Sequence, residues 1–365
     1  MKGSFVKAAQ MLSLYGEHFL PKEMKDFISQ VQSEGHYLEW SKLKNLIPIE
    51  VHQKIDISSE PLAAASIGQV HRGVYQGQEV VLKIQYEGIR QAIDLDLRLL
   101  KLLMRSLRIL PKKINLDPIY DEIKKNLIRE MDYKEELATQ VKFRDSLQSD
   151  QYYIPKAYPE VSTENILVSE YCSGALLSSS QIKNLSQDKK NDIARRIFRL
   201  FFLELFELNL IQTDAHPGNF LFDKKTDKLI LIDFGSVRSF DDAIIKKYQN
   251  LIKSFYLDDE TLFKNTFQDM LDSTEAIVSI DLNDLWEYCR FVTIPIRQDE
   301  FDWSDSTHAE EVYKKAQKTI LKADVKTPPH QFLFIDRKVV GLFFLMKTLD
   351  AKFNAKNILA EFIRD

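Results

Sequence analysis

The chain has 365 residues, of which 44% are hydrophobic and 28% charged, and it contains 23 phenylalanines. This composition excludes a disordered chain and predicts a folded globular protein of about two domains or lobes. The net charge of −4, with no long basic run, excludes the electrostatic footprint of a nucleic-acid-binding protein.

The sequence shows no sign of secretion or of a membrane span. Cys172 and Cys289 are too few for a disulfide framework, which favours a reducing compartment. Residues 1–7 lack the unbroken apolar core of a signal peptide. The apolar run 339–346 has eight residues, whereas a membrane span needs roughly 20. We expect a soluble, cytoplasmic protein that is at most peripheral to a membrane surface.

The first segment, residues 5–31, carries apolar side chains at helical spacing. Gly16 and Pro21 interrupt that spacing, so two amphipathic helices are predicted. Lys7 and Gln10 lie three positions apart on one face of the first helix. On the local pattern alone, this pair is interpreted as solvated.

A run of small residues precedes the apolar strand predicted over 80–84 by about the length of a hairpin. A kinase has its glycine-rich phosphate loop at this position. Because alanine resists the positive φ angles that glycine accepts, we expect a stiffer loop whose backbone can still approach phosphates. Lys83 in the strand resembles the kinase lysine that binds nucleotide phosphates, the alternative being a strand lysine that faces solvent. The small residues of the loop are Ala63, Ala64, Ala65 and Ser66.

Two long helices are predicted next, the first over 89–110 and the second from about residue 118. On a regular helix Glu130 and Glu136 point about 120° apart, so they serve different partners. Glu136 is the candidate for the helix carboxylate that orients Lys83. Asp132 can face the same partner as Glu130 only if the helix begins or distorts between them. The alternative is an exposed helix with many surface ion pairs.

An apolar strand over 166–168 runs into a polar turn that contains Gly174. In a two-lobed nucleotide-binding enzyme, the hinge between the lobes lies at this position. Backbone groups of Glu170, Tyr171 and Cys172 would then contact the adenine edge, and an ordinary strand end is the alternative. The dense apolar positions over 192–211 predict a largely buried helix that leads to the next motif.

Asp214 and Asn219 are five residues apart, and Asp233, which begins a DFG sequence, follows fourteen residues later. This is the spacing of a kinase-type catalytic loop and metal loop. Apolar strands predicted over 220–222 and 229–232 place these polar residues at strand ends. We expect Asn219 and Asp233 to hold Mg²⁺ against nucleotide phosphates, and Asp214 to position or deprotonate an attacking hydroxyl or water. The alternative is an ordinary β-hairpin with polar turns.

No long activation segment follows Asp233. Instead, the pattern predicts a series of helices, among them segments over 244–256, 259–271, 282–292 and 337–353. Trp286 and Trp303 are expected to pack in the core or between these helices.

Together these residues resemble the UbiB/AarF family of atypical kinases, which includes the coenzyme Q biosynthesis kinases. Its K-x-G-Q motif is matched by residues 7–10, with Ala9 in place of the family's glycine. The alanine-rich loop, the E-x-D motif at 130–132 and the catalytic and metal loops follow in the family's order. The resemblance covers nearly the whole chain, from Lys7 to about Phe353.

The resemblance implies an α+β, two-lobed protein-kinase-like fold. Residues 1–50 would form a helical N-terminal extension, 51–172 the N-lobe, and 173–365 a mainly helical C-lobe. In the family, the extension covers the place where a protein kinase admits its peptide substrate. Lys7 and Gln10 would there meet Glu130 and Asp132 in a regulatory contact.

The resemblance further implies that ATP and Mg²⁺ are cofactors and that the chain is an atypical kinase or ATPase. It implies a role in isoprenoid quinone (ubiquinone) biosynthesis, with a quinone-precursor lipid or a membrane surface as partner. The alternatives are a small-molecule phosphotransferase resembling antibiotic kinases and a nucleotide-binding pseudokinase scaffold. The E-x-D motif argues against the first. The intact set of Lys83, Asp214, Asn219 and Asp233 argues against the second.

Overall fold

The computed structural model describes residues 37–65, 67–106, 117–273, 277–322, 324–327 and 333–363. The chain divides into two compact units. The first contains Met1–Lys112, Leu116–Ser173 and Ile230–Ser236, and the second contains Lys113–Asn115, Gly174–Leu229 and Val237–Asp365. The metal-loop sequence at 233–235 therefore belongs to the first unit, which a division of the chain into consecutive domains does not anticipate.

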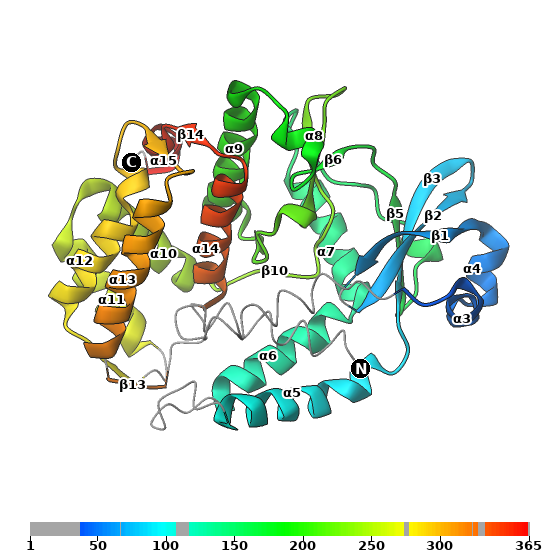
Figure 1. Ribbon diagram of the computed structural model, residues 1–365, viewed down its shortest axis with the longest axis horizontal. Coiled ribbons are helices and arrows are strands. Elements are labelled where there is room, and N and C mark those ends of the chain that lie inside the picture. Colours follow the sequence, from blue (N-terminus) through cyan, green and yellow to red (C-terminus); the bar gives the residue numbers. More distant parts are fainter. Residues whose placement is uncertain are drawn as a thin grey trace. The chain divides into compact units, whose positions relative to one another are not determined.

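The first unit is built on a four-stranded antiparallel sheet (Figure 1). Its third strand alternates between buried and partly exposed residues, as expected for a strand with one face on a core. Val80, Leu82 and Ile84 are fully buried, whereas Lys83 points to the other face. In sheet order the strands are β1 (Ile55–Ala65), β2 (Gly68–Tyr75), β3 (Gln78–Gln85) and β5 (Ile166–Glu170).

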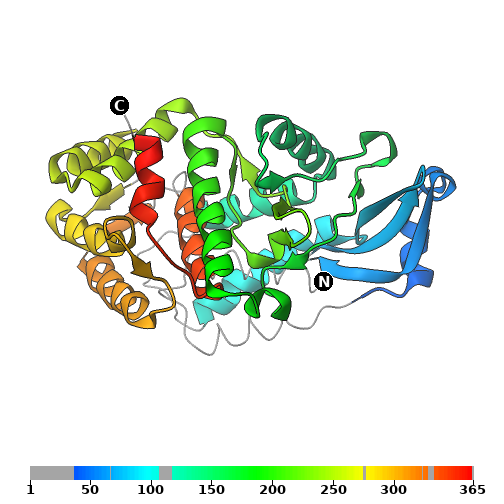
Figure 2. The ribbon, with the colours of Figure 1, turned by 90° about the horizontal axis from the view of Figure 1, so that it is seen from above.

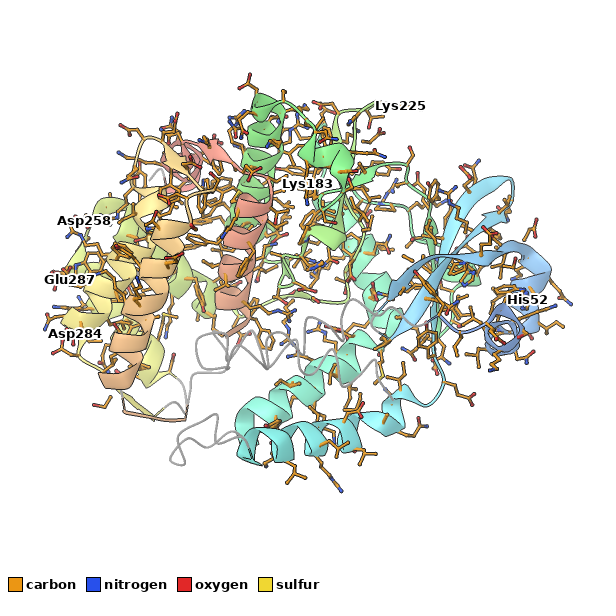
Figure 3. All side chains as sticks on the ribbon, viewed as in Figure 1. His52, Lys183, Lys225, Asp258, Asp284 and Glu287 are labelled. Carbon is orange, nitrogen blue, oxygen red and sulfur yellow. The ribbon has the colours of Figure 1, made fainter. Side chains whose placement is uncertain are left out.

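The sheet's core also receives side chains from the segment that precedes β1. This segment forms α3 (Trp40–Leu43), a 3₁₀ turn (Lys44–Leu46) and α4 (Ile49–Lys54). Leu43 and Ile47 pack in one apolar cluster with the buried residues of β3. His52 of α4, labelled in Figure 3, is half-buried.

Within the described residues, the first unit also contains three longer helices: α5 (Ile89–Ser106), α6 (Asp117–Glu130) and α7 (Tyr133–Ser146). The single helix expected from residue 118 is thus broken at Met131 and Asp132. Asp132 is the N-cap of α7, and its carboxylate accepts a hydrogen bond from the Glu135 N–H at 3.0 Å. An aspartate at this position satisfies an unpaired helix N–H, which stabilises the break. This break is the distortion between Glu130 and Asp132 that their side chains need in order to share a partner.

The second unit is mainly helical, and α14 and α15 lie beside α9 (Figures 1 and 2). Phe198 of α9 packs against Phe353 and Trp303, and both Trp286 and Trp303 are buried. The helices are α8 (Ser180–Lys183), α9 (Gln187–Phe202), α10 (Asp242–Leu257), α11 (Glu260–Asp272), α12 (Leu282–Val292), α13 (Ser306–Lys322), α14 (Leu333–Thr348) and α15 (Ala355–Ile363).

The helix predicted over 192–211 is buried as expected, but it ends earlier. After α9 the chain continues as a π-helical segment, Leu203–Leu208, and stops at Asn209, whose φ is 47°. Asparagine tolerates this left-handed conformation better than most residues. The Asn209 side chain also donates to the Phe240 carbonyl at 2.8 Å and accepts from the Phe240 N–H at 3.0 Å. These bonds fix the point at which the chain turns toward Asp214.

Short strands connect the helices. The strands predicted over 220–222 and 229–232 are β8 (Phe220–Asp223) and β9 (Lys228–Leu231). β7 (Ile211–Gln212) pairs with β10 (Val237–Arg238), and β6 (Ala175–Leu176) pairs with β8. The others are β4 (Tyr152–Tyr153), β11 (Ile277–Ser279), β12 (Phe301–Asp302), β13 (Asp324–Thr327) and β14 (Lys352–Phe353). Among the described residues, no helix is both long and apolar enough to cross a membrane.

Candidate nucleotide-binding and catalytic residues

The first unit brings together three of the residues that the sequence singled out. The Lys83 ammonium donates to both carboxylate oxygens of Glu136 at 3.0 Å. Asp233 Oδ2 lies 3.8 Å from the same ammonium. β3 supplies the lysine, α7 supplies the glutamate, and the segment after β9 supplies the aspartate. Glu136 is 4% exposed and Lys83 20%, so the lysine is the more accessible member of the pair.

The charges in this cluster depend on one another. Burial acts to lower the pKa of Lys83, but the carboxylates of Asp233 and Glu136 outweigh burial and hold that pKa above its ordinary value. Burial also raises the pKa of the Glu136 carboxyl, and the Lys83 ammonium opposes this rise. Lys83 is therefore a fixed positive charge, which is the group needed to bind phosphate oxygens.

Each residue of the DFG sequence contributes to this arrangement. Phe234 is buried and packs on Phe143 of α7, with ring centroids 5.6 Å apart. A Cβ added to Gly235 would lie 3.3 Å from Glu136 Oε2, so a side chain there would crowd the ion pair. The Gly235 N–H donates to Asp233 Oδ1 at 3.1 Å. The loop thus holds the Asp233 carboxylate, which remains 35% exposed, beside Lys83.

The alanine-rich segment is a strand rather than the predicted loop. Ala63, Ala64 and Ala65 are the last residues of β1 and pair with residues of β2. The prediction was wrong because β2 offers this segment a pairing partner, which outweighs the low intrinsic preference of alanine for strands. Gly68, at the start of β2, is required by close approach, since a Cβ there would lie 2.2 Å from the Ile84 carbonyl oxygen. Ser66 lies outside the described residues.

The predicted hinge residues follow β5. The Tyr171 N–H donates to the Glu79 carbonyl at 3.0 Å, and the Glu170 N–H donates to the Lys156 carbonyl at 2.8 Å. The predicted adenine contact can use neither N–H group unless these bonds open. The Glu170 side chain is also engaged, because it accepts from the Tyr153 hydroxyl at 2.8 Å. Cys172 is half-buried and is not part of a disulfide bond.

The catalytic-loop residues lie in the second unit. Asp214 follows β7, and its carbonyl accepts from the His216 N–H at 2.8 Å and from the Asn219 side-chain amide at 2.9 Å. His216 Nδ1 accepts from the Gly218 N–H at 3.0 Å. These bonds fix the shape of the loop between Asp214 and Asn219. They also show how Asp214 and Asn219, five positions apart, are held on one short loop.

Sequence reasoning missed the partner of Asp214. The Arg337 guanidinium, on α14, donates to Asp214 Oδ1 at 2.8 Å across 123 residues of sequence. Arg337 is 10% exposed and Asp214 22%. On the sequence alone, Arg337 is only the start of the helix predicted over 337–353. The one available signal was the pair of basic residues, Arg337 and Lys338, at the beginning of an otherwise apolar run.

α14 also packs closely on the rest of the catalytic loop. Lys338 forms an ion pair with Glu204 at 2.9 Å, and their side chains are 1% and 0% exposed. Burial raises the pKa of Glu204 even though Lys338 and a backbone bond from Gln212 oppose the rise. One turn later, a Cβ added to Gly341 would lie 2.8 Å from Ala215 Cβ. Only glycine allows α14 to approach the loop this closely.

Not every predicted site residue lies within the described part of the chain. Lys7 and Gln10 lie outside the described residues, so their contact with Glu130 and Asp132 stays a prediction. Glu130 is the last residue of α6, and Asp132 caps α7. The helix break brings these two carboxylates to the junction of two helices, where a regular helix would have turned them apart.

Residues 30–267 match the family model described as the ABC1 atypical kinase-like domain. The chain belongs to this family. A relative named "Atypical kinase COQ8, mitochondrial" from Saccharomyces cerevisiae is 31% identical over 374 residues, covering 99% of this chain and 74% of the relative. The protein of the same name from Schizosaccharomyces pombe is 29% identical and is matched over 61% of its own length. The resemblance to the UbiB/AarF atypical kinases is confirmed.

Among solved structures, a Mycobacterium tuberculosis protein in complex with erythromycin superposes with a TM-score of 0.67. The alignment covers 97% of this chain and 90% of that protein, at 22% sequence identity. At this identity the likeness shows the fold alone. Together with the ABC1 family match, it confirms the predicted α+β, kinase-like fold.

Proposed function

We propose that the chain is a Mg²⁺- and ATP-dependent atypical kinase or ATPase that supports isoprenoid quinone biosynthesis. The observation that carries the proposal is the cluster of Lys83, Glu136 and Asp233 in the first unit. A buried glutamate holds a protonated lysine, and a partly exposed carboxylate stands beside it. This combination suits a phosphate chain neutralised by a divalent cation.

Each residue has a role in the proposal. Lys83 binds phosphate oxygens and Glu136 orients it. Asp233 and Asn219 supply oxygen ligands of the kind that Mg²⁺ prefers, and a single exposed carboxylate suits an ion that also takes ligands from substrate phosphates. Mg²⁺, when bound, neutralises charge on the transferred phosphoryl group. Asp214 positions the attacking hydroxyl or water, or accepts its proton.

The remaining predicted contacts belong to the same proposal. The backbone near Ala63, Ala64 and Ala65 approaches the phosphates. The segment Glu170 to Cys172 contacts the adenine edge through groups other than the two N–H groups that donate to Lys156 and Glu79. The family match and the relatives named as atypical kinases support phosphoryl transfer. Quinone biosynthesis, a lipid partner and a cytoplasmic or peripheral location rest on the resemblance to the coenzyme Q biosynthesis kinases.

The small-molecule phosphotransferase alternative has one observation behind it, the fold likeness to the protein solved with erythromycin. At 22% identity this likeness does not extend to a substrate. The family match favours the atypical kinase instead.

The proposal is tested by the change in melting temperature that Mg-ATP causes. Wild type should gain stability with Mg-ATP but not with ATP and a chelator, since a ligand that binds only the folded state raises its stability. Asp233→Asn should lose most of this gain. Asp299→Asn, which makes the same change at a side chain that is 91% exposed, is the matched control and should keep it. An equal gain in Asp233→Asn and wild type would contradict the proposed metal ligand. No gain in wild type would contradict the proposed function.

A further inference from the structure

Tyr133, the first residue of α7, carries a hydroxyl group that none of the described residues binds. The side chain is fully buried, and within the described part of the chain its hydroxyl has no hydrogen-bond partner. Buried hydroxyl groups almost always have a partner, because leaving one unpaired costs free energy that a phenylalanine would not. The same unit does pair other tyrosines: Tyr86 donates to Gln69 at 2.9 Å, and Tyr153 donates to Glu170.

The position of Tyr133 ties it to the charged cluster. It precedes Glu136 by three residues, so the two side chains share one face of α7. The Lys83 ammonium lies 5.2 Å from the centre of the Tyr133 ring, within the range of a cation–π contact. The ring therefore forms part of the surroundings of the lysine that is proposed to bind phosphates.

The hydroxyl is a donor in this position. Burial raises the pKa of Tyr133 well above its ordinary value, so the group keeps its proton. Lys83 has no acceptor to offer, and its ammonium is already engaged by Glu136. The acceptor that suits the Tyr133 hydroxyl is an anionic oxygen brought to the cluster by the charge of Lys83.

We propose that Tyr133 is a further binding residue, whose hydroxyl donates to a phosphate oxygen of the nucleotide that Lys83 attracts. This inference rests on the proposed function. Its physical consequence is specific: the hydroxyl is unfavourable in the free protein and favourable in the complex. Replacing the hydroxyl by hydrogen should therefore keep or raise the stability of the free protein and lower its affinity for the nucleotide.

Tyr133→Phe tests this consequence. The free variant should be at least as stable as wild type in thermal unfolding. By calorimetry, its affinity should fall roughly 10-fold both for Mg-ATP and for Mg-tripolyphosphate, the effect of losing one hydrogen bond to a charged group. Affinity for adenosine should not change, because adenosine has no phosphate.

Tyr86→Phe is the matched control, since it removes a hydroxyl that has a protein partner. It should lower the stability of the free protein and leave the affinity for Mg-ATP unchanged. If Tyr133→Phe loses as much stability as Tyr86→Phe, its hydroxyl is bound within the protein and the inference is wrong. If wild type and Tyr133→Phe bind Mg-ATP equally, the hydroxyl does not contact the nucleotide. If wild type itself binds no Mg-ATP, the proposed function fails, and this inference fails with it.

Discussion

The two units each contain an ion pair built around a residue of a kinase motif, and the pairs are buried in opposite ways. In the Lys83–Glu136 pair the carboxylate is 4% exposed and the ammonium 20%. In the Asp214–Arg337 pair the guanidinium is 10% exposed and the carboxylate 22%. In both cases the more exposed member is the one that the motif assigns to nucleotide chemistry. The more buried member holds it in place.

This difference indicates what each buried partner does. A buried charge loses hydration, and it is retained where a second charge compensates for that loss. Glu136 holds the Lys83 ammonium in place and helps to keep it charged. Arg337 holds the Asp214 carboxylate in place. The comparison predicts that changing an exposed member affects chemistry or binding directly. Changing a buried member should act through its partner.

The largest expected effect is that of Asp214→Asn, because it removes the exposed carboxylate of the second pair. Asparagine keeps an oxygen for Arg337, so the loop should retain its shape. We expect nucleotide affinity within a few-fold of wild type and ATP turnover lower by roughly 10²-fold or more, the scale of a lost general base. Steady-state turnover and calorimetry measure the two quantities. Equal losses in both would reassign Asp214 to metal binding.

Glu136→Gln should have the next largest effect, because Lys83 loses the charge that orients it. We expect an affinity for Mg-ATP about 10-fold weaker than that of wild type, on the scale of a hydrogen bond to a charged group, and a lower melting temperature of the free protein. Glu164→Gln is the control, since Glu164 is also paired with a lysine, Lys134, but on the surface. An unchanged affinity in Glu136→Gln would show that Lys83 needs no partner, and the comparison would no longer hold.

Arg337→Gln should have a smaller effect on turnover, about 10-fold, because Asp214 remains in the site but is less firmly held. The decisive measurement is a double-mutant cycle with Asp214→Asn. If Arg337 acts through the Asp214 charge, Arg337→Gln should cost little further turnover once that charge is gone. Arg290→Gln, which breaks the surface pair with Asp258, is the control. Equal losses in both backgrounds would make Arg337 only a structural support for α14.

The two pairs also differ in how far the sequence could predict them. Asp214, Asn219 and Asp233 are set by short spacings, and Glu136 follows from helix geometry once Lys83 is recognised. Arg337 is 123 residues from Asp214, and no local pattern connects them. A contact of this kind depends on how α14 packs, and close approach at Gly341 is part of that packing.

Two other features that the sequence left open, the alanine-rich segment and the start of α7, have different causes. The alanine-rich segment is a strand because β2 pairs with it, and pairing partners decide strand formation more than the intrinsic preference of alanine does. The break before α7 depends on Asp132 acting as a cap, and the sequence was compatible with either a cap or a continuous helix. A pairing strand decided the first case, and a local cap decided the second.

The buried side chain of His71 extends the comparison of the two ion pairs, because hydrogen bonds hold it without a charge. His71 is fully buried; its Nδ1 lies 2.8 Å from the Ser58 carbonyl oxygen and its Nε2 2.8 Å from Gln69 Nε2. Gln69 Oε1 accepts from the Leu38 N–H and the Tyr86 hydroxyl, so the Gln69 amide presents its N–H to His71. His71 Nε2 is then an acceptor, Nδ1 is the donor, and the ring is neutral.

The smallest expected effect is therefore a loss of stability in mild acid. Burial lowers the pKa of His71 from the ordinary value of 6.5, against the opposing hydrogen bond to Ser58. The unfolded chain then binds more protons than the folded one as pH falls below 6.5, so stability should decrease in that direction. The loss should be smaller than the ~3–5 kcal/mol of a broken buried ion pair.

Urea unfolding between pH 5 and pH 8 measures this slope. His71→Phe should be less stable at every pH, because Gln69 and Ser58 lose a partner, but its stability should depend less on pH than that of wild type. His52→Gln removes a half-buried histidine of α4, labelled in Figure 3, and should keep the wild-type slope. If His71→Phe and wild type show the same slope, the ring is not the group that takes up the proton. The acid sensitivity would then have to come from another group, such as His308, whose pKa burial also lowers, and the prediction for His71 would be wrong.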